Sequence, residues 1–350
     1  MAGMPSPASE PDLHDPATRR RLAGFLAAAT GASAVEIDAS SRLRNGAVQE
    51  NWLLALRFDG GRLAGRLRLV LRTDARTGLA ASHDRMTEFA VQRAAHAAGV
   101  TVPEPLFACG DAAVIGKPFF IMRWLPGNAD GASIVAGSLG GPGDALAARL
   151  ARELAAIHAI RPPQTGLDAV LGAPPADPAR HRLAQLERAL AADADPHPVA
   201  EWGLRWLTLH APPPVPAVLC HGDFRTGNYL ADADGFVALL DWEFARWSDR
   251  DEDIGWFCLG CWRFGAYARE AGGIASRDVF YRAYEAAAGR ALDPTRIRYW
   301  EVMAALRWLV LALQQRDRFL RGGERSLDLA LTGRRPAECE FEILRLTEAA

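Results

Sequence analysis

The chain has 350 residues, 49% of them hydrophobic and 23% charged, which is typical of a folded protein with two lobes or domains. Its net charge of -2 argues against nucleic-acid binding, which needs a concentrated basic surface. No signal-like segment stands near the start, and the apolar stretch Val302–Leu313 is too short to cross a bilayer, so we expect a cytoplasmic protein with no membrane partner.

The first lobe begins with a polar stretch. About the first 18 residues indicate a disordered tail, and Arg20–Ala29 has the spacing of a short amphipathic helix. Two segments that alternate apolar and polar residues follow, Trp52–Phe58 and Leu63–Arg72. The sequence Asp59-Gly60-Gly61 between them is a hairpin signal.

The rest of this lobe contains a helix and further strands. Arg85–Ala98 has helical spacing and ends at Gly99, and Val114–Trp124 returns to strand character. Residues 19–125 are therefore expected to form a β-rich N-lobe, and we expect it to hold a nucleotide.

The single lysine of the chain excludes one large class of nucleotide-binding proteins. A Walker A loop requires Gly-Lys followed by Ser or Thr, and here Gly116-Lys117 is followed by Pro118. The chain is therefore not a P-loop NTPase.

Residues 126–350 are predicted to form a mainly helical C-lobe with an embedded hairpin, which gives an α+β protein. Pro126–Gly143 has the composition of a linker. The predicted helices are Asp144–Ile160, Pro178–Ala192, Val199–His210, Arg277–Gly289 and Arg296–Leu320, and the two short strands expected to be neighbours are Val218–Cys220 and Phe236–Leu240.

Each short strand is followed by residues that suit phosphoryl transfer. Such transfer needs a carboxylate that orients the acceptor hydroxyl and hard oxygen ligands for magnesium. Asp223 and Asn228 are five residues apart, as in the motif H-x-D-x-x-x-x-N, and Asp241 takes the place of the D-F-G aspartate. Alone, each of these residues would indicate a turn or cap; together they predict a catalytic site.

The stretches CHGDFRTGN (Cys220–Asn228) and LLDWEFA (Leu239–Ala245) resemble the aminoglycoside phosphotransferase-like and choline-kinase-like small-molecule kinases. They are most similar to bacterial phosphotransferases related to the kinase-like domain of acyl-CoA dehydrogenase fusions. The resemblance spans about Arg42 to Leu331 and implies a two-lobed protein-kinase-like fold and an ATP- and Mg²⁺-dependent phosphotransferase.

The resemblance also implies roles for single residues of this chain. Asp223 would be the catalytic base, His221 would brace its loop, and Asn228 and Asp241 would bind magnesium. In the run Asp249–Ile254, Asp253 would anchor the catalytic loop, while we expect Asp251 and Glu252 to lie on a solvated acidic face.

Other singled-out residues favour a structural interpretation. The five cysteines are too sparse for a disulfide framework, and Cys258 and Cys261 form a C-x-x-C with no second metal-binding pair nearby, so we expect buried core cysteines. His158 lies on an apolar helix face and is expected to be a packed core histidine.

The N-lobe departs from the kinase pattern. Arg72 stands where kinases have a phosphate-binding lysine, and Glu88 would be its partner; the alternative is a surface arginine and a glutamate favoured by the helix dipole. The phosphate-covering loop would lie at Leu43–Asn51, which contains one glycine. Met122 and Trp124 fall where an interlobe hinge would bind adenine, or they belong to a strand core.

The acceptor is expected to be a small molecule bound by Cys261–Arg335. This segment has fourteen arginines and eight acidic residues, a surplus of six positive charges that argues against a polycationic aminoglycoside and favours a neutral or anionic acceptor. A hydroxyacyl thioester of coenzyme A is the hypothesis that the resemblance suggests.

Two rival functions differ in class. A nucleotide-binding pseudokinase is suggested by the glycine-poor loop and Arg72. A kinase of proteins is disfavoured because only about a dozen residues separate Asp241 from the Asp249–Asp253 run, and no A-P-E motif follows. The sequence leaves open the choice between ATP and GTP, the acceptor and the oligomeric state.

Overall fold

The computed structural model describes residues 12–43, 49–74, 82–164, 166–193, 195–322, 324 and 326–348. The chain forms two compact units. The first runs to Pro126 and also contains Ala238–Phe244, and the second contains Gly127–Val237 and the chain from Ala245 onward.

The segment Ala238–Phe244 belongs to the first unit although it follows more than a hundred residues of the second. The backbone N–H of Leu239 donates to the carbonyl of Thr101 at 2.9 Å, and that of His83 donates to Glu243 at 2.8 Å. The sequence-based division counted this segment, and Asp241 with it, in the C-lobe. Backbone pairing with residues 83 and 101 is what places it in the first unit.

The first unit is built on a five-stranded antiparallel sheet with strand order β1-β2-β3-β5-β4. The predicted strands at Trp52–Phe58 and Leu63–Arg72 lie largely within β2 and β3. The strands are β1 (Ala34–Leu43), β2 (Gln49–Asp59), β3 (Gly65–Asp74), β4 (Pro105–Cys109) and β5 (Phe119–Arg123).

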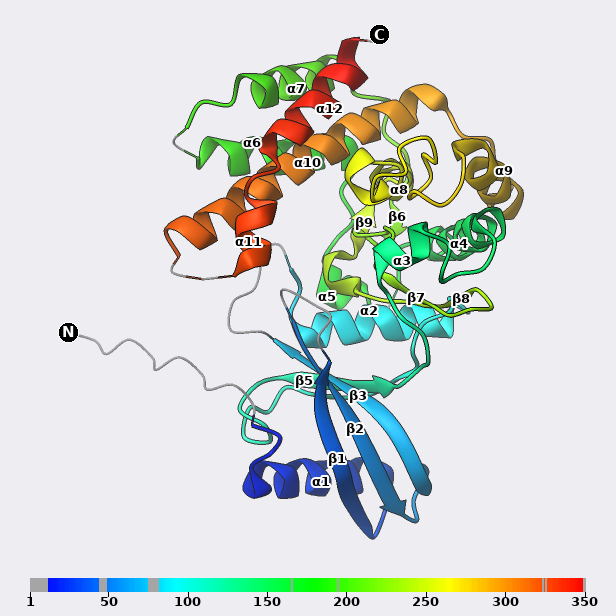
Figure 1. Cartoon of the computed structure of the whole chain (residues 1–350), viewed down its shortest axis with the longest axis vertical. Coiled ribbons are helices and arrows are strands. Elements are labelled where there is room, and N and C mark those ends of the chain that lie inside the picture. The colour runs from blue at the N-terminus through cyan, green and yellow to red at the C-terminus, as the bar shows by residue number, and fades with distance from the viewer. Residues whose placement is uncertain are drawn as a thin grey trace, which may run out of the picture. The chain divides into compact units, whose positions relative to one another are not determined.

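Helices α1 (Pro16–Thr30) and α2 (Arg85–Ala97) cover opposite faces of this sheet (Figure 1). Because side chains alternate between faces along a strand, Leu69 and Leu71 pack in the same core cluster as Leu22 and Leu26 of α1, while Val70 between them packs on the other face. Phe120, Met122 and Phe89 of α2 share that second cluster.

Helix α1 begins four residues earlier than predicted. The Asp15 carboxylate accepts a hydrogen bond from the Thr18 N–H at 2.9 Å, and Pro16 occupies the first turn, so both common start signals precede Arg20. Leu13, just before the helix, is only 1% exposed. The predicted tail of 18 residues is therefore too long, and residues 1–11 of it lie outside the described part of the chain.

The second unit is mainly helical, and its longest helix, α10 (Pro294–Leu320), packs against α6, α7, α8, α11 and α12. Helix α4 lies alongside α9 (Figure 1). The other helices are α3 (Gly131–Val135), α4 (Gly143–His158), α5 (Asp168–Leu171), α6 (Pro178–Ala191), α7 (Pro198–Leu209), α8 (Asp251–Phe257), α9 (Arg277–Ala288), α11 (Leu327–Thr332) and α12 (Pro336–Glu348). Among the described residues, no helix combines the length and apolar character that crossing a bilayer requires.

The short strands pair differently from the prediction. β6 (Val218–Cys220) pairs with β9 (Arg246–Ser248), and β8 (Phe236–Leu239) pairs with β7 (Tyr229–Ala231). The expected pairing of Val218–Cys220 with Phe236–Leu240 is therefore wrong. β7 and β9 have three residues each, which is too short for a period-two pattern to reveal them.

Gly255 of α8 packs tightly against the backbone of α10. A Cβ at this position would lie 2.7 Å from the carbonyl carbon of Trp300 and 2.9 Å from the Glu301 nitrogen. We expect Gly255→Ala to lower the free energy of unfolding by about 1–3 kcal/mol, because the backbone of α10 must move.

The matched control is Gly24→Ala on α1, where a Cβ would meet nothing within 4 Å. Its free energy of unfolding should rise by about 0.5–1 kcal/mol, since alanine favours the helix. Urea unfolding of both variants measures the two effects, and a Gly255→Ala protein as stable as wild type would contradict the close packing.

Candidate active site

The loop after β6 is held by a buried carboxylate of α8. Asp253 is fully buried, and its Oδ2 accepts a hydrogen bond from the His221 N–H at 2.7 Å while its Oδ1 accepts from the Gly222 N–H at 2.8 Å. The anchoring contact predicted for Asp253 is therefore present. Two consecutive backbone groups are fixed immediately before Asp223.

His158 of α4 is hydrogen-bonded on both ring nitrogens. Its Nε2 lies 3.2 Å from Asp253 Oδ2 and its Nδ1 lies 2.7 Å from the Tyr284 hydroxyl of α9. The predicted core histidine is buried, with 5% of its surface exposed. His158 also contacts the carboxylate of Asp253. The apolar residues around His158 in the sequence did not indicate this contact.

Cys220, His158 and Asp253 lie close enough together to resemble a metal site, with candidate ligand atoms within 4.8 Å of one another. Burial, reinforced by the carboxylates of Asp253, Glu252 and Asp249, raises the pKa of the Cys220 thiol well above its usual value. The Asp253 oxygens already accept hydrogen bonds from two backbone N–H groups, and both ring nitrogens of His158 are hydrogen-bonded. The cluster is a structural support for the loop.

The Asp223 carboxylate is oriented by three side-chain donors. Oδ1 accepts from Trp256 Nε1 at 2.7 Å, and Oδ2 accepts from Asn228 Nδ2 at 2.5 Å and from Arg225 Nε at 3.2 Å. Asn228 Nδ2 also donates to the Asp223 carbonyl at 2.9 Å. The structure thus brings Asp223 and Asn228 together, and the Asp223 N–H donates to His221 Nδ1 at 3.3 Å.

Trp256 and Arg307 are site residues that the sequence analysis did not assign. The Arg307 guanidinium lies 4.1 Å above the Trp256 ring, and its Nη1 donates to the Gly222 carbonyl at 2.6 Å. Arg307 therefore supports both the loop and the tryptophan that binds Asp223. Its signal was available, since it is a charged residue inside the apolar stretch Val302–Leu313.

Asp251 and Glu252 do not form a solvated face. Their exposed fractions are 0% and 5%, so that prediction is wrong. Arg296 Nε lies 3.2 Å from Asp251 Oδ2, and Glu252 Oε1 lies 2.6 Å from Arg246 Nη1. Arginines of α6, β9 and α10 form ion pairs with these buried carboxylates. These partners are distant in the sequence, so the local sequence does not indicate the burial.

Three predicted residues of the first unit converge on one ion-pair cluster. Arg72 Nη2 lies 2.8 Å from Glu88 Oε1 and 2.6 Å from Asp241 Oδ1. Arg72 and Glu88 are 4% and 1% exposed, so the alternative of a surface arginine is excluded. Burial alone would lower the pKa of Arg72, but Glu88, Asp241 and Glu243 raise it above its usual value. The arginine stays charged.

Asp241 differs from its partners in backbone conformation and exposure. Its φ of 64° lies in the left-handed region, which is costly for a residue other than glycine, and such strain is concentrated at functional sites. Its side chain is 32% exposed. Glu243 nearby is buried and accepts from the Ser82 hydroxyl at 2.6 Å, and burial raises its pKa.

Met122 and Trp124 lie at and just beyond the end of β5. The Met122 side chain is buried in the sheet core, and Gln92 Nε2 lies 3.5 Å from its sulfur. The Trp124 ring lies 5.2 Å from the Arg68 guanidinium carbon. Both side chains belong to the sheet, and an adenine contact through the backbone stays a prediction. Most of the expected phosphate-covering loop, residues 44–48, lies outside the described residues.

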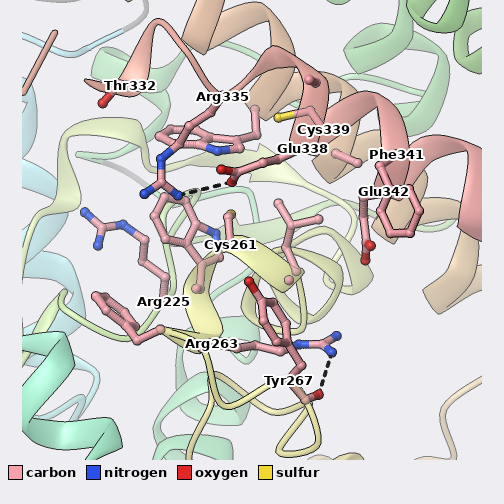
Figure 2. A pocket seen from close by; sticks show the side chains of 18 of the residues that line it. Arg225, Cys261, Arg263, Tyr267, Thr332, Arg335, Glu338, Cys339, Phe341 and Glu342 are labelled. Atoms are coloured by element: carbon pink, nitrogen blue, oxygen red, sulfur yellow. Dashed lines mark hydrogen bonds and ion pairs between the residues drawn. The ribbon is translucent and has the colours of Figure 1, made fainter. Parts of the chain in front are cut away.

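The second unit contains a pocket of about 1280 Å³ between the 260–267 segment, α10, α11 and α12 (Figure 2). Five aromatic residues line it: Trp262, Phe264, Tyr267, Trp308 and Phe341. Cys261 also lines it and is only partly buried, whereas Cys258 is a buried core cysteine as expected. The sequence-based prediction included neither α12 nor its contribution to the pocket.

The arginine surplus of Cys261–Arg335 is not a property of this pocket. Of the arginines of this segment that the structure describes, Arg263 and Arg335 line it. Others are engaged elsewhere in the unit: Arg277 with Glu301, Arg296 with Asp249, Arg307 with Gly222, and Arg316 with Asp193. The charge count along the segment therefore does not describe this pocket.

Comparisons with known proteins agree with the geometry. The model of the phosphotransferase enzyme family matches residues 40–306. Acyl-CoA dehydrogenase family member 10 of Mus musculus is 30% identical over 214 residues, which cover 58% of this chain and 20% of that protein. Family member 11 of Rattus norvegicus is 26% identical over 265 residues, 72% of this chain and 34% of that protein. The chain thus spans about a fifth to a third of the curated relatives it matches.

Solved structures confirm the predicted kinase-like α+β fold. A candidate aminoglycoside phosphotransferase from Ralstonia eutropha has a TM-score of 0.74 and 18% identity, with 95% of this chain and 98% of that chain covered. A thermostable aminoglycoside phosphotransferase mutant in complex with ADP and hygromycin B has a TM-score of 0.58 and 17% identity, with 94% and 98% covered. The resemblance to aminoglycoside phosphotransferase-like proteins is confirmed with it.

The hydrogen bonds of Asp253 should stabilise the folded protein, so replacing this carboxylate should destabilise it. In Asp253→Asn, the amide nitrogen must face a backbone N–H or His158, so one buried hydrogen bond is lost and two donors meet. We expect the free energy of unfolding to fall by about 1–3 kcal/mol. Asp38→Asn, at an exposed position of β1, should change it by no more than about 0.5 kcal/mol, and equal effects would contradict the anchoring role.

The charge of Glu252 should make the stability of the folded protein depend on pH. Burial would raise its pKa, but Arg182, Arg246 and Arg307 lower it to about 2, below the value of 4.5 expected in the unfolded chain. The stabilisation by Glu252 is therefore present above pH 4.5 and is lost as the pH falls toward 2.

The variant Glu252→Gln should be less stable than wild type at pH 6, and the difference should shrink as the pH falls from 4.5 toward 2. Urea unfolding at a series of pH values measures it. A difference that does not depend on pH would show that the charge of Glu252 is not what stabilises this cluster.

Proposed function

Because the chain belongs to the phosphotransferase enzyme family, we propose that it transfers the γ-phosphate of ATP, or of GTP, to a hydroxyl group of a small molecule. The observation that carries the proposal is the Asp223 carboxylate, which is oriented by Trp256, Asn228 and Arg225 on a loop fixed by Asp253. A cytoplasmic setting is proposed with it, supported by five unpaired cysteines.

Asp223 acts as the catalytic base in this proposal. Oδ2 accepts from both Asn228 and Arg225, whereas Oδ1 accepts from Trp256 and keeps a second lone pair that can accept a hydrogen bond from the acceptor hydroxyl. As that hydroxyl oxygen attacks phosphorus, its proton passes to Asp223. His221 holds the loop through its backbone N–H and its Nδ1.

Arg72 and Glu88 are proposed to act on the nucleotide. The Arg72 fork is held by two carboxylates, and its Nε is buried with no hydrogen-bond partner among the described residues. A fixed guanidinium with an unused donor suits binding of phosphate oxygens. Met122 and Trp124 are proposed to contribute the backbone that binds the base.

The proposed magnesium ligands are Asn228 and Asp241, and their chemistry fits the ion. The Asn228 amide nitrogen donates to Asp223, which leaves the amide oxygen as the ligand atom. Asp241 offers a partly exposed carboxylate. Both are hard oxygen donors of the kind magnesium prefers. When bound, the ion offsets the charge on the phosphate oxygens.

The acceptor is proposed to be a small neutral or anionic alcohol, with a hydroxyacyl thioester of coenzyme A as the specific hypothesis. The resemblance to the acyl-CoA dehydrogenase family members supports this choice. Aminoglycosides are bound by structural neighbours of low identity, and those neighbours share the fold alone. The second candidate is a nucleotide-binding pseudokinase, favoured by the arginine at position 72.

The test of the base is Asp223→Asn. We expect phosphate transfer to fall by at least about 10²-fold while nucleotide affinity stays within a few-fold of wild type, because the amide keeps the shape of the side chain but cannot take a proton. Asp144→Asn, at an exposed position, is the matched control and should transfer at the wild-type rate. Equal activity of Asp223→Asn and wild type would exclude Asp223 as the base.

Asp241→Ala should instead weaken binding of the magnesium nucleotide itself. Calorimetric titration with the nucleotide and Mg²⁺ measures this, and unchanged affinity would exclude Asp241 as a ligand. A wild-type protein that binds the nucleotide but transfers phosphate to no alcohol would favour the pseudokinase.

A further inference from the structure

The outer face of α12 carries large apolar side chains that are exposed to solvent. Helix α12 packs on α10 and α7 (Figure 1), and Cys339, Ile343 and Leu346 on its inner face belong to the core cluster of the second unit. On the outer face, Phe341 is 67% exposed and Leu344 is 38% exposed. A phenylalanine and a leucine exposed one turn apart on a helix indicate a contact surface.

The exposed residues of α12 have the spacing of a coiled-coil stripe. Ala337 is also exposed, and Ala337, Phe341 and Leu344 follow one another at intervals of four and three residues. With 3.6 residues per turn, Ala337 and Leu344 project to one side of Phe341 and form an apolar flank. Glu338 and Arg345 project to its other side and form a charged flank.

The two residues of the charged flank lie at similar distances from Phe341 along the helix. At a rise of about 1.5 Å per residue, Glu338 lies about 4.5 Å before Phe341 and Arg345 about 6 Å after it. The Glu338 and Arg345 side chains are 65% and 47% exposed. Within the chain, Arg345 Nη2 lies 2.6 Å from Glu342 Oε1, which orients the guanidinium. Both charges remain accessible to a second molecule.

This face of α12 is complementary to a second copy of itself. When two copies pack antiparallel about a two-fold axis at Phe341, each flank of one helix meets the same flank of the other. Glu338 then faces Arg345 of the second copy, and Ala337 faces Leu344 of the second copy. Both pairs match to within about 1.5 Å along the helix. A parallel two-fold arrangement would instead set the charged flank against the apolar flank.

We propose that the outer face of α12 is a dimerisation surface, on which a second copy of the chain packs antiparallel with Phe341 at the two-fold axis. The proposal does not depend on the proposed reaction. One helix from each copy makes a small interface, so the dimer forms reversibly and its population rises with protein concentration. Because Glu338, Phe341 and Arg345 also line the pocket, the second copy lies at the edge of that pocket.

Sedimentation equilibrium of the full chain, from about 1 µM to about 200 µM, measures the association. We expect a monomer–dimer equilibrium that weakens as the salt concentration rises. Phe341→Glu should lower the association constant by at least about 100-fold, because it removes the aromatic contact and brings two carboxylates together at the axis. The matched control is Leu209→Glu on α7, since Leu209 is 69% exposed, and its association should stay within about twofold of wild type.

Exchange of the two charges tests the antiparallel pairing. Glu338→Arg should weaken the association by about tenfold, because each substituted arginine then faces Arg345 of the other copy. The double variant Glu338→Arg, Arg345→Glu restores opposite charges across the axis and should recover most of the lost association. Thermal unfolding shows that each variant is folded.

Several results would overturn the proposal. A wild-type chain that stays monomeric over the whole concentration range would show that a second copy does not cover this face. A dimer that persists in Phe341→Glu, or that is lost equally in Leu209→Glu, would place the interface elsewhere. A loss in Glu338→Arg that the double variant does not recover would contradict the antiparallel pairing of Glu338 with Arg345.

Discussion

The buried carboxylate of Asp253 is the constraint on which the loop carrying Asp223 depends. A carboxylate removed from water is costly unless it is hydrogen-bonded, and here two consecutive backbone N–H groups and His158 supply those bonds. Because His158 lies on α4 and bonds Tyr284 of α9, the packing of these two helices is tied to the loop that carries Asp223. The position of the Asp223 carboxylate, the proposed base, therefore follows from the folding of the helices around it.

Both units place arginine where charge must be held in the interior. In the first unit, one Arg72 nitrogen bonds both Glu88 and Asp241, and in the second, Arg182 and Arg246 both reach Glu252. The planar fork of arginine suits such sharing better than the point charge of lysine. Networks of this kind contribute modestly to stability after desolvation, and their value lies in fixing geometry. The chain has a single lysine, Lys117, so its buried carboxylates are paired almost entirely by arginine.

Much of this arrangement could be predicted from the sequence where the information is local. Helical spacing located α2 and α4 closely, and the spacing of Asp223 and Asn228 predicted two side chains that the structure brings together. Features that depend on distant partners could not be predicted in this way. The pairing of β6 with β9 joins three-residue strands, and the burial of Asp251 and Glu252 depends on arginines from other elements. The aromatic pocket likewise forms only when α12 packs beside the 260–267 segment.

Thermal unfolding of the wild-type chain with ATP or GTP, each with and without Mg²⁺, tests whether Arg72, Asn228 and Asp241 belong to a nucleotide and metal site. We expect a raised unfolding temperature that requires both the nucleotide and the metal, since binding to the folded state alone stabilises it. No stabilisation by either nucleotide in the presence of Mg²⁺ would contradict the assignment of Arg72, Asn228 and Asp241 to a nucleotide and metal site.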